Sequence, residues 1–328
     1  MKIGVILPHS KLYGGVKRFL ELGNLFIRDN HEFTIFNEHG DKPDWFDFKG
    51  EITRIEKINQ HQLDALFFTE TKYYNIVAKA NTKQRIFYFV KSGEKLKEII
   101  KDSSFQIFTN STNLFNECNR RYGVAPYKAL GGIDTQLYRV DSFNIRQPGD
   151  PFVIIAFGRL NKKRKGTKFI VKACEKVAKR NKNIKLILFD TPTDEKALEA
   201  INNFKSSVDH EYIINNPYYK NPEMFQRGHV YISAEYRTGY SNTSAEAMAC
   251  GLTVIGTKSG TQDFLLHEET GLVVKRNSHS IAKAIERLMN DDALRIKLAK
   301  SGRDKILGLS WDHLYSIILN KLTKDIET

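Results

Sequence analysis

The sequence predicts an α/β protein with two open parallel β-sheets in series, and three observations support this prediction. Short apolar runs typical of buried strands alternate along the chain with stretches that carry apolar residues at helical spacing. A polar break at residues 140–151, which contains two prolines and one glycine, separates a first series from a second. A length of 328 residues also suits two domains better than one compact core.

The first series opens with a strand-like run and a loop that contains the glycine pair Gly14 and Gly15. Residues 16–27 then show a helical pattern of apolar positions. Paired glycines permit a close approach of the backbone to a ligand or a positive φ, although a tight turn explains them equally well. The predicted strands of this series are residues 2–7, 33–36, 65–68, 85–90 and 105–108.

The second series restarts directly after the polar break and ends in helices. We expect Ser310 to cap the last helix, with Trp311 as an apolar anchor. Because open α/β sheets bind ligands beyond the carboxyl ends of their strands, we expect the functional residues in the loops that follow strands. The predicted strands are residues 152–157, 185–189, 212–214, 230–233 and 253–257, and the helices are residues 167–180, 280–289 and 312–326.

Composition and charge narrow the class of protein. No apolar run reaches the length needed to span a bilayer, and the N-terminal residues lack the zones of a signal peptide. The three cysteines are scattered, so we expect reduced packing residues in a cytoplasmic protein. The net charge is +13, and residues 159–185 hold twelve basic residues against one acid. This cluster would attract a polyanion, or it is an ordinary solvated helix face.

The first motif with chemical content lies in the loop after the strand at residues 152–157. Arg159 follows this strand, and Lys165 comes six residues later, just before a helix. An arginine fork, a lysine point charge and a helix N-terminus together suit a diphosphate, whose departure both cations would stabilise. An ordinary basic loop is the alternative interpretation.

The second motif is the segment at residues 238–251, TGYSNTSAEAMACG. Thr243 and Glu246 are spaced as a capping box at the start of a short helix that Gly251 ends. In the functional interpretation, the amides of residues 239–243 lie beside a phosphate or sugar, and Glu246 accepts hydrogen bonds from ribose hydroxyls. The two interpretations are compatible, since both place Glu246 near the start of the helix.

These segments together resemble the family 4 glycosyltransferases, which are retaining enzymes of the GT-B type. Gly14 to Arg18 resembles the glycine pair and first helix of that family, and Gly131 to Thr135 resembles the end of its N-terminal domain. Gly158-Arg159-Leu160 with Lys165-Gly166 resembles its diphosphate-binding pair. Residues 239–251 resemble its signature, and residues 259–261 and 269–274 resemble two later segments.

The resemblance implies a GT-B architecture with two Rossmann-like domains facing across a cleft. It implies an N-terminal acceptor-side domain at residues 1–142, a nucleotide-sugar-binding domain at residues 143–308, and a C-terminal helix at residues 309–328 that crosses back to the N-terminal domain. It also implies metal-independent transfer, without a cofactor, from a UDP- or GDP-sugar to a glycan or lipid-linked acceptor. The catalytic pair would be Arg159 and Lys165, and the donor-binding residues would be Gly14, Gly15, Thr238, Gly239, Tyr240, Ser241, Asn242, Thr243 and Glu246.

Three features depart from the family pattern. Thr238 stands where the family has a glutamate that touches the transferred sugar, and Glu235 is a candidate substitute. No histidine follows the strand at residues 85–90, where Lys91 and Ser92 stand instead. Residues 189–192, Phe-Asp-Thr-Pro, replace a turn that is often glycine-rich.

These departures keep a second hypothesis open, namely a degenerate protein that binds a nucleotide sugar without turnover. The basic cluster at residues 159–185 raises a nucleic-acid-binding protein as a third, but no recognition motif is present, so we expect no nucleic-acid partner. Lys168, Lys172, Lys176 and Lys179 share one helix face, and residues 91–101 form a second basic stretch. Either could contact an anionic membrane at its inner face, or simply be solvated.

Overall fold

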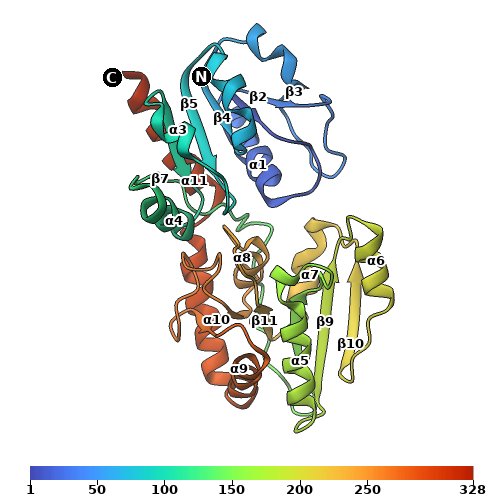
Figure 1. The fold of residues 1–328 in the computed structure, drawn as a ribbon. Coiled ribbons are helices and arrows are strands. Elements are labelled where there is room, and N and C mark those ends of the chain that lie inside the picture. Colours follow the sequence, from blue (N-terminus) through green and yellow to red (C-terminus); the bar gives the residue numbers. More distant parts are fainter. Residues whose placement is uncertain (328) are drawn as a thin grey trace. The chain divides into compact units, whose positions relative to one another are not determined.

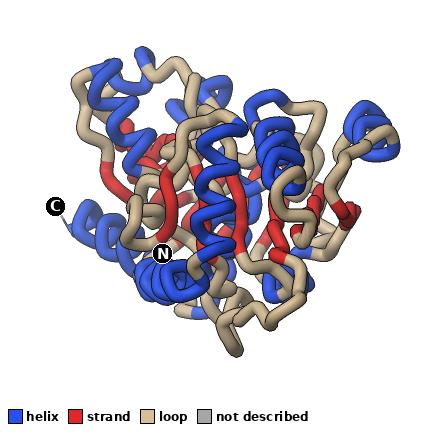
Figure 2. The backbone as a smooth tube through the Cα atoms, turned by 90° about the horizontal axis from the view of Figure 1, so that it is seen from below, coloured by secondary structure: helices blue, strands red, loops and turns tan. Residues whose placement is uncertain are grey.

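The computed structural model describes residues 1–327, with side chains for residues 1–325, and divides into two compact units (Figure 1). Unit 1 contains Met1–Gly132 together with the chain from Leu309 onward, and unit 2 is Ile133–Gly308. Each unit contains one parallel sheet with helices packed on it, so the predicted pair of Rossmann-like α/β domains is confirmed. Figure 2 shows the strands in red among the helices in blue.

Unit 1 is built on a seven-stranded parallel sheet in the order β3-β2-β1-β4-β5-β6-β7. Successive residues of β1, Val5 and Ile6, belong to different hydrophobic cores, so both faces of the sheet are buried, as a parallel sheet requires. The strands are β1 (Lys2–Ile6), β2 (Glu32–Asn37), β3 (Glu51–Arg54), β4 (Leu63–Phe68), β5 (Thr82–Phe89), β6 (Phe105–Thr109) and β7 (Tyr127–Lys128). The helices are α1 (Gly14–Arg28), η1 (Ile55–Gln60), η2 (Thr71–Tyr73), α2 (Tyr74–Lys79), α3 (Lys97–Lys101) and α4 (Thr112–Tyr122).

Unit 2 is built on a six-stranded parallel sheet in the order β10-β9-β8-β11-β12-β13. The order reverses at β8, so β9 and β11 lie on either side of it. The strands are β8 (Phe152–Phe157), β9 (Ile184–Asp190), β10 (Asp209–Ile214), β11 (Val230–Ser233), β12 (Thr253–Gly256) and β13 (Gly271–Val273). The helices are η3 (Lys163–Lys165), α5 (Thr167–Ala178), α6 (Glu195–Asn202), η4 (Tyr218–Lys220), α7 (Asn221–Gln226), α8 (Asn242–Ala249), α9 (Ser278–Asn290) and α10 (Asp292–Leu307).

All ten strands predicted from apolar runs are present, and the strands that the sequence analysis missed share one property. β3, β7 and β13 are each at the edge of a sheet and only two to four residues long. An edge strand pairs on one side only, so it needs fewer apolar residues and leaves a weak pattern in the sequence.

The last helix, α11 (Trp311–Glu327), packs in unit 1, as the predicted return of the C-terminal helix requires. Leu314, Tyr315, Ile318 and Leu322 join the core formed by α1 and the first strands. The ring of Tyr315 meets that of Phe26 edge-on at 4.8 Å. The Ser310 hydroxyl accepts a hydrogen bond from the backbone N–H of His313 at 3.2 Å, so the predicted cap is formed.

The chain passes between the units at residues 132–133 and 308–309, whereas the sequence analysis placed the first boundary after residue 142. Residues that looked like linker lie in unit 2 instead. Val140 and Phe143 pack against Gly251, and the Asn144 side chain donates to the carbonyl of Gly228 at 3.1 Å. Arg295 donates to the Asn144 carbonyl at 2.9 Å. These contacts join residues far apart in sequence, so the polar composition alone could not indicate them.

Two glycines are the last residues of the N-terminal segment of unit 1. Gly131 and Gly132 have φ values of +95° and +99°, which L-residues with a side chain rarely adopt. The N–H of Gly132 donates to the carbonyl of Leu309 at 2.9 Å. A Cβ atom at Gly132 would lie 2.2 Å from the Trp311 ring, so only glycine fits where the C-terminal segment returns.

We predict that Gly132→Ala lowers the free energy of unfolding by more than the roughly 1–3 kcal/mol of backbone strain alone, because the new methyl also overlaps Trp311. Gly93→Ala is a matched control, since Gly93 has φ +102° and nothing within 4 Å of its Cβ position. Urea unfolding of both variants tests the prediction. Equal losses of stability would contradict the packing argument.

His229, directly before β11, is a buried neutral imidazole. Its Nδ1 accepts a hydrogen bond from the N–H of Val153 at 2.9 Å, and its ring stacks on Phe152 at 5.2 Å. Burial, reinforced by the charge of Arg295, lowers the pKa of His229 to about 4. Protonation would remove the acceptor that holds Val153.

The unfolded chain binds a proton at His229 with a pKa near 6.5, so this group stabilises the fold fully above that pH and progressively less as the pH falls toward 4. We predict that wild-type protein loses about 2 kcal/mol more unfolding free energy than His229→Gln between pH 7 and pH 5. Urea denaturation at both pH values measures the difference. The exposed His313→Gln should behave like wild type, and an identical loss in all three proteins would contradict the assignment.

The structure also bears on the cysteines, on membrane-spanning helices and on metal-binding groups. Cys118, Cys174 and Cys250 are free and buried, and burial raises the pKa of the Cys174 thiol to about 12. None of the helices within residues 1–327 is both long and apolar enough to cross a bilayer. Among the same residues, no group of three or more His, Cys, Asp or Glu side chains is arranged to hold a metal ion.

Candidate functional site

The loop between β8 and α5 carries the predicted cationic pair, and its backbone is held at both ends. At the start, the Tyr212 hydroxyl donates a short hydrogen bond to the carbonyl of Gly158. At the end, the Thr167 hydroxyl makes hydrogen bonds to the carbonyls of Phe157, at 3.1 Å, and Arg159, at 3.3 Å. Arg159 therefore projects from a fixed piece of backbone at the carboxyl edge of the sheet.

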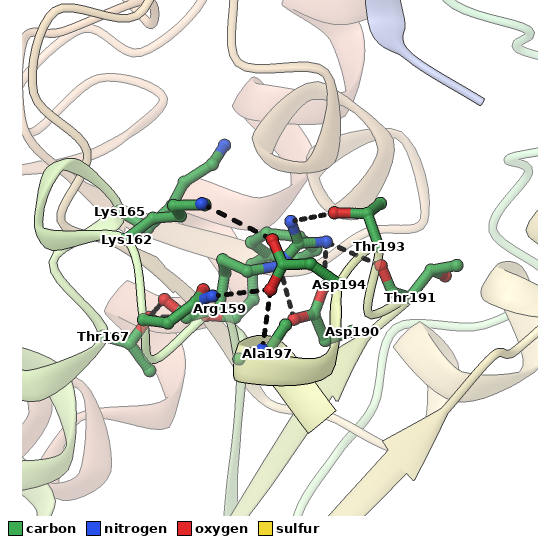
Figure 3. Close-up of polar contacts among 12 residues, drawn as sticks. Arg159, Lys162, Lys165, Thr167, Asp190, Thr191, Thr193, Asp194 and Ala197 are labelled. Carbon is green, nitrogen blue, oxygen red and sulfur yellow. Dashed lines mark hydrogen bonds and ion pairs between the residues drawn. The ribbon is translucent and has the colours of Figure 1, made fainter. Parts of the chain in front are cut away.

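The Arg159 side chain forms a two-pronged ion pair with Asp190, the last residue of the neighbouring strand β9 (Figure 3). Nε donates to Oδ2 at 2.6 Å, and Nη2 donates to Oδ1 at 2.7 Å. Nη2 also donates to the carbonyl of Thr191 at 2.6 Å, and Nη1 lies 3.5 Å from the Thr193 hydroxyl. Side-chain exposure is 14% for Arg159 and 1% for Asp190, so the carboxylate is buried behind the guanidinium.

A second carboxylate ties the same loop to the segment after β9 (Figure 3). Asp194 caps α6 by accepting from the N–H of Ala197 at 2.8 Å, and it also accepts from Asn161 at 3.2 Å. The Lys162 ammonium lies 3.6 Å from the same carboxylate. The backbone bond to Ala197, together with the charges of Lys162 and Arg159, lowers the pKa of Asp194.

Lys165 forms an ion pair with Glu235, which follows β11 in the loop on the other side of β8. Its ammonium also lies over the Phe157 ring, 5.0 Å from the centroid. Glu235 is buried, whereas the Lys165 side chain is 28% exposed. An ammonium has three N–H donors, and Glu235 is its one hydrogen-bond acceptor among the described residues. Lys165 can therefore donate to a ligand without leaving Glu235.

The cationic loop lies tightly against the loop after β11. Gly166 has a φ of +75°, and a Cβ atom there would lie 2.1 Å from the carbonyl oxygen of Ala234. The N–H of Tyr236 donates to the carbonyl of Arg164 at 2.9 Å. Arg276 joins both loops, since Nε donates to Ala234 at 2.7 Å and Nη2 donates to the carbonyl of Lys163 at 2.5 Å.

The segment at residues 238–251 does form the predicted short helix, but the proposed capping box is absent. α8 begins at Asn242, its cap residue is Ser241, and no side chain makes a capping hydrogen bond. Thr243 is inside the first turn, and its hydroxyl accepts from the Tyr231 hydroxyl at 2.8 Å. The capping interpretation of Thr243 and Glu246 was therefore wrong, because the helix starts two residues earlier than that motif requires, with Ser241 and not Thr243 as its cap residue.

The amides at the start of α8 are not all available. The N–H of Ser241 already donates to the carbonyl of Gly260 at 2.8 Å. The N–H groups of Asn242 and Thr243 belong to the first turn, where the helix itself supplies no acceptor. Any ligand held by backbone amides here would rely on Asn242 and Thr243, not on the Ser241 amide that the sequence analysis included.

Thr238, Gly239 and Tyr240 form the connection that leads into α8. The N–H of Thr238 donates to the Ser259 hydroxyl at 2.9 Å, and the Tyr240 ring packs edge-on against Phe264 at 5.5 Å. Gly239 and Tyr240 are buried, and Thr238 is half-buried. Arg237, the residue before this connection, has a φ of +56°. The connection is thus fixed by residues 259–264 on one side.

Glu246 lies in the middle of α8 and is 8% exposed. Its carboxylate lies close to Cys250 and Tyr138. Burial raises the pKa of both groups, and the negative charge of Glu246 raises it further. The Tyr138 hydroxyl also donates to the carbonyl of Tyr218 at 3.3 Å. Glu246 therefore lies near the side chains of Tyr138 and Cys250, and its expected role toward a ribose stays a prediction.

Gly14 and Gly15 are in unit 1, where they are the first two residues of α1. Neither has a positive φ, and Gly14 is exposed, so within the unit neither position demands glycine for backbone reasons. After β5, Ser92 donates to Glu117 at 2.6 Å and Lys91 is exposed. The part of these residues in a donor site stays a prediction.

Residues 139–305 match the protein family described as "Glycosyl transferases group 1", and this match covers just over half of the chain. The chain belongs to that family. The matched region contains the whole cationic loop, its carboxylate partners and α8. Membership therefore applies to the part of unit 2 in which the candidate site was found.

Two curated relatives are similar over part of their length. The capsular polysaccharide biosynthesis glycosyltransferase CapM of Staphylococcus aureus is 26% identical over 236 residues, which are 66% of this chain and 59% of CapM. The putative glycosyltransferase YtcC of Bacillus subtilis is 33% identical over 92 residues, which are 27% of this chain and 23% of YtcC. This chain thus spans less than two thirds of either relative.

Solved structures share the fold over almost the entire chain. A glycosyltransferase from Rickettsia africae has a TM-score of 0.79 at 15% identity, with 100% of this chain and 99% of that chain covered. Sucrose-phosphate synthase from Thermosynechococcus elongatus has a TM-score of 0.75 at 16% identity, covering 99% and 98%. Anabaena HepE in complex with UDP has a TM-score of 0.74 at 13% identity, covering 99% and 100%. The chain therefore has the GT-B fold.

Several residues of the site, among them Asp190, Asp194, Arg276 and Tyr138, escaped sequence reasoning. Asp190 was visible only as part of an unexplained departure, Arg276 only as one more cation, and Tyr138 only as an aromatic residue in a polar stretch. A charged residue at the carboxyl end of a buried strand was the signal that could have singled out Asp190. No local signal could have identified Arg276, because its acceptors are the carbonyls of Ala234 and Lys163.

Proposed function

We propose that this chain is a retaining glycosyltransferase that transfers a sugar from a UDP- or GDP-sugar to a glycan or lipid-linked acceptor, without a metal ion. The observation that carries the proposal is the position of Arg159 and Lys165 in a family of glycosyl transferases. Both cations lie on one loop at the carboxyl edge of the sheet in unit 2. Ligands of open α/β sheets bind at this edge.

The chemistry needs positive charge where the leaving group forms. As the bond between the anomeric carbon and the phosphate oxygen breaks, its electron pair stays on the nucleoside diphosphate. The acceptor hydroxyl oxygen forms the new bond on the same face of the sugar, and its proton passes to the departing diphosphate. Arg159 and Lys165 would stabilise the departing diphosphate, since both are held in place before substrate arrives.

The relatives support the substrate classes in this proposal. CapM is named for capsular polysaccharide biosynthesis, which favours a glycan or lipid-linked acceptor. HepE was solved with UDP and with UDP-glucose, which favours a UDP-sugar as donor. Thr238, in place of a glutamate that would touch the sugar, indicates that the sugar recognised here is chosen by other contacts.

We predict that Arg159→Ala and Lys165→Ala each lower turnover of the preferred donor roughly 10²–10³-fold, because each removes a preorganised charge from the leaving group. Release of UDP or GDP from UDP-glucose, UDP-N-acetylglucosamine and GDP-mannose measures this. Lys182→Ala is the control, since Lys182 is exposed beyond the end of α5 and should leave turnover unchanged. If the unmodified protein neither binds nor consumes any of these donors, the proposal fails.

The alternative is a degenerate protein that binds a nucleotide sugar without turnover. Thr238 favours it, because the chain lacks the family glutamate at that position. Arg159 also already forms an ion pair with the carboxylate of Asp190. A thermal-shift response to UDP or GDP, without release of nucleotide in the presence of acceptor lipids or glycans, would select this alternative.

We further propose a cytoplasmic enzyme that contacts the inner face of an anionic membrane through α5. Lys168, Lys172, Lys176 and Lys179 are all exposed. Each basic residue near such a surface contributes about 1 kcal/mol. We predict co-sedimentation with phosphatidylglycerol-containing vesicles but not with pure phosphatidylcholine, and loss of binding when all four lysines become glutamate. Binding that survives this change would contradict the role of α5.

A further inference from the structure

Asp190 occupies an unusual position for a buried acid. It is the last residue of β9, at the edge of the sheet where the proposed donor binds, and its side chain is 1% exposed. Both of its oxygens accept hydrogen bonds from Arg159, at 2.6 and 2.7 Å. The backbone beside it adds a further acceptor, the carbonyl of Thr191.

This arrangement fixes one edge of the guanidinium. Asp190 engages Nε and Nη2, which leaves Nη1 on the opposite side (Figure 3). The Nη1 contact, 3.5 Å to the Thr193 hydroxyl, is longer than an ordinary N–H···O hydrogen bond. A phosphate oxygen could therefore replace the Thr193 hydroxyl at Nη1 while the pair with Asp190 stays intact.

A buried ion pair of this kind is weak support for stability, because removing two charges from water offsets much of their attraction. The ion pair affects the orientation of the Arg159 guanidinium more than it affects the stability of the fold. Arginine has a long flexible side chain, and a two-pronged bond to a fixed carboxylate holds the planar group in one orientation. A glycine at position 190, in a turn of the glycine-rich kind, could make no such contact.

We propose that Asp190 is a positioning residue that orients the Arg159 guanidinium toward the nucleoside diphosphate of the donor. This inference rests on the proposed function, since it requires Arg159 to bind that diphosphate. It explains why the chain has Phe189-Asp190-Thr191-Pro192 at this point: Asp190 supplies the carboxylate and Thr191 the carbonyl.

Positioning and simple electrostatics predict opposite effects of removing the carboxylate. If Asp190 acted only as a negative charge near the site, its loss would strengthen binding of an anion. If Asp190 holds Arg159 in place, its loss weakens binding although the site becomes more positive. The sign of the change in affinity therefore separates the two roles.

The experiment measures the Kd of the full-length protein for UDP by calorimetry, in wild type, Asp190→Ala, Arg159→Ala and the double variant. We expect Asp190→Ala to weaken UDP binding about tenfold, and to add nothing in the Arg159→Ala background, because residues that act as a unit are not additive. Asp190→Asn keeps the shape and one acceptor, so it should restore part of the affinity. It also serves if Asp190→Ala does not fold.

Glu211→Ala is the matched control, since Glu211, on β10 of the same sheet, forms a two-pronged pair with Arg227, which follows α7. It should leave the Kd for UDP unchanged. Unchanged or tighter UDP binding in Asp190→Ala, or a loss that persists in the absence of Arg159, would overturn the inference. An Arg159→Ala protein that binds UDP as wild type does would instead overturn the diphosphate role of Arg159 in the proposed function.

Discussion

The candidate site depends on the close approach of two loops at Gly166. The absence of a side chain there lets the loop after β8 lie against Ala234, in the loop after β11. This approach brings Lys165 to Glu235 and lets Arg276 bridge both backbones. A larger residue at position 166 would separate the loops. Lys165 would then lose its contact with Glu235, and Arg276 could no longer bridge the two backbones.

The second general feature of the site is that its cations are already balanced. Asp190, Asp194 and Glu235 face the cationic loop, and the first and last of these are buried. Buried carboxylates require partners, so each cation is held in a defined place even without a ligand. The cationic side chains of such a site are held in place before a ligand binds. Preorganised charges of this kind are what stabilisation of a leaving group requires.

The residues that resemble the family and the residues that depart from it are distinct. The glycines, Arg159, Lys165 and Glu246 are the residues that the sequence resemblance assigns to the family pattern, and solved glycosyltransferases share the fold. Thr238 and Asp190 do not follow that pattern, and both lie at the edge where the donor would bind. Under the proposed function, the departures would bear on which sugar is recognised and on how Arg159 is held, whereas the shared residues would bear on the class of reaction.

The sequence by itself determined ten of the strands, the cap at Ser310 and the loop that carries Arg159 and Lys165, because these depend on local periodicity and on residues close together in the chain. Tertiary structure alone decided the short edge strands β3, β7 and β13, the boundary at Gly132 and the partners of both cations. Asp190 is 31 positions from Arg159, and Glu235 is 70 positions from Lys165. Such pairs meet only when parallel strands align their carboxyl ends, and no local pattern specifies which side chains then face each other.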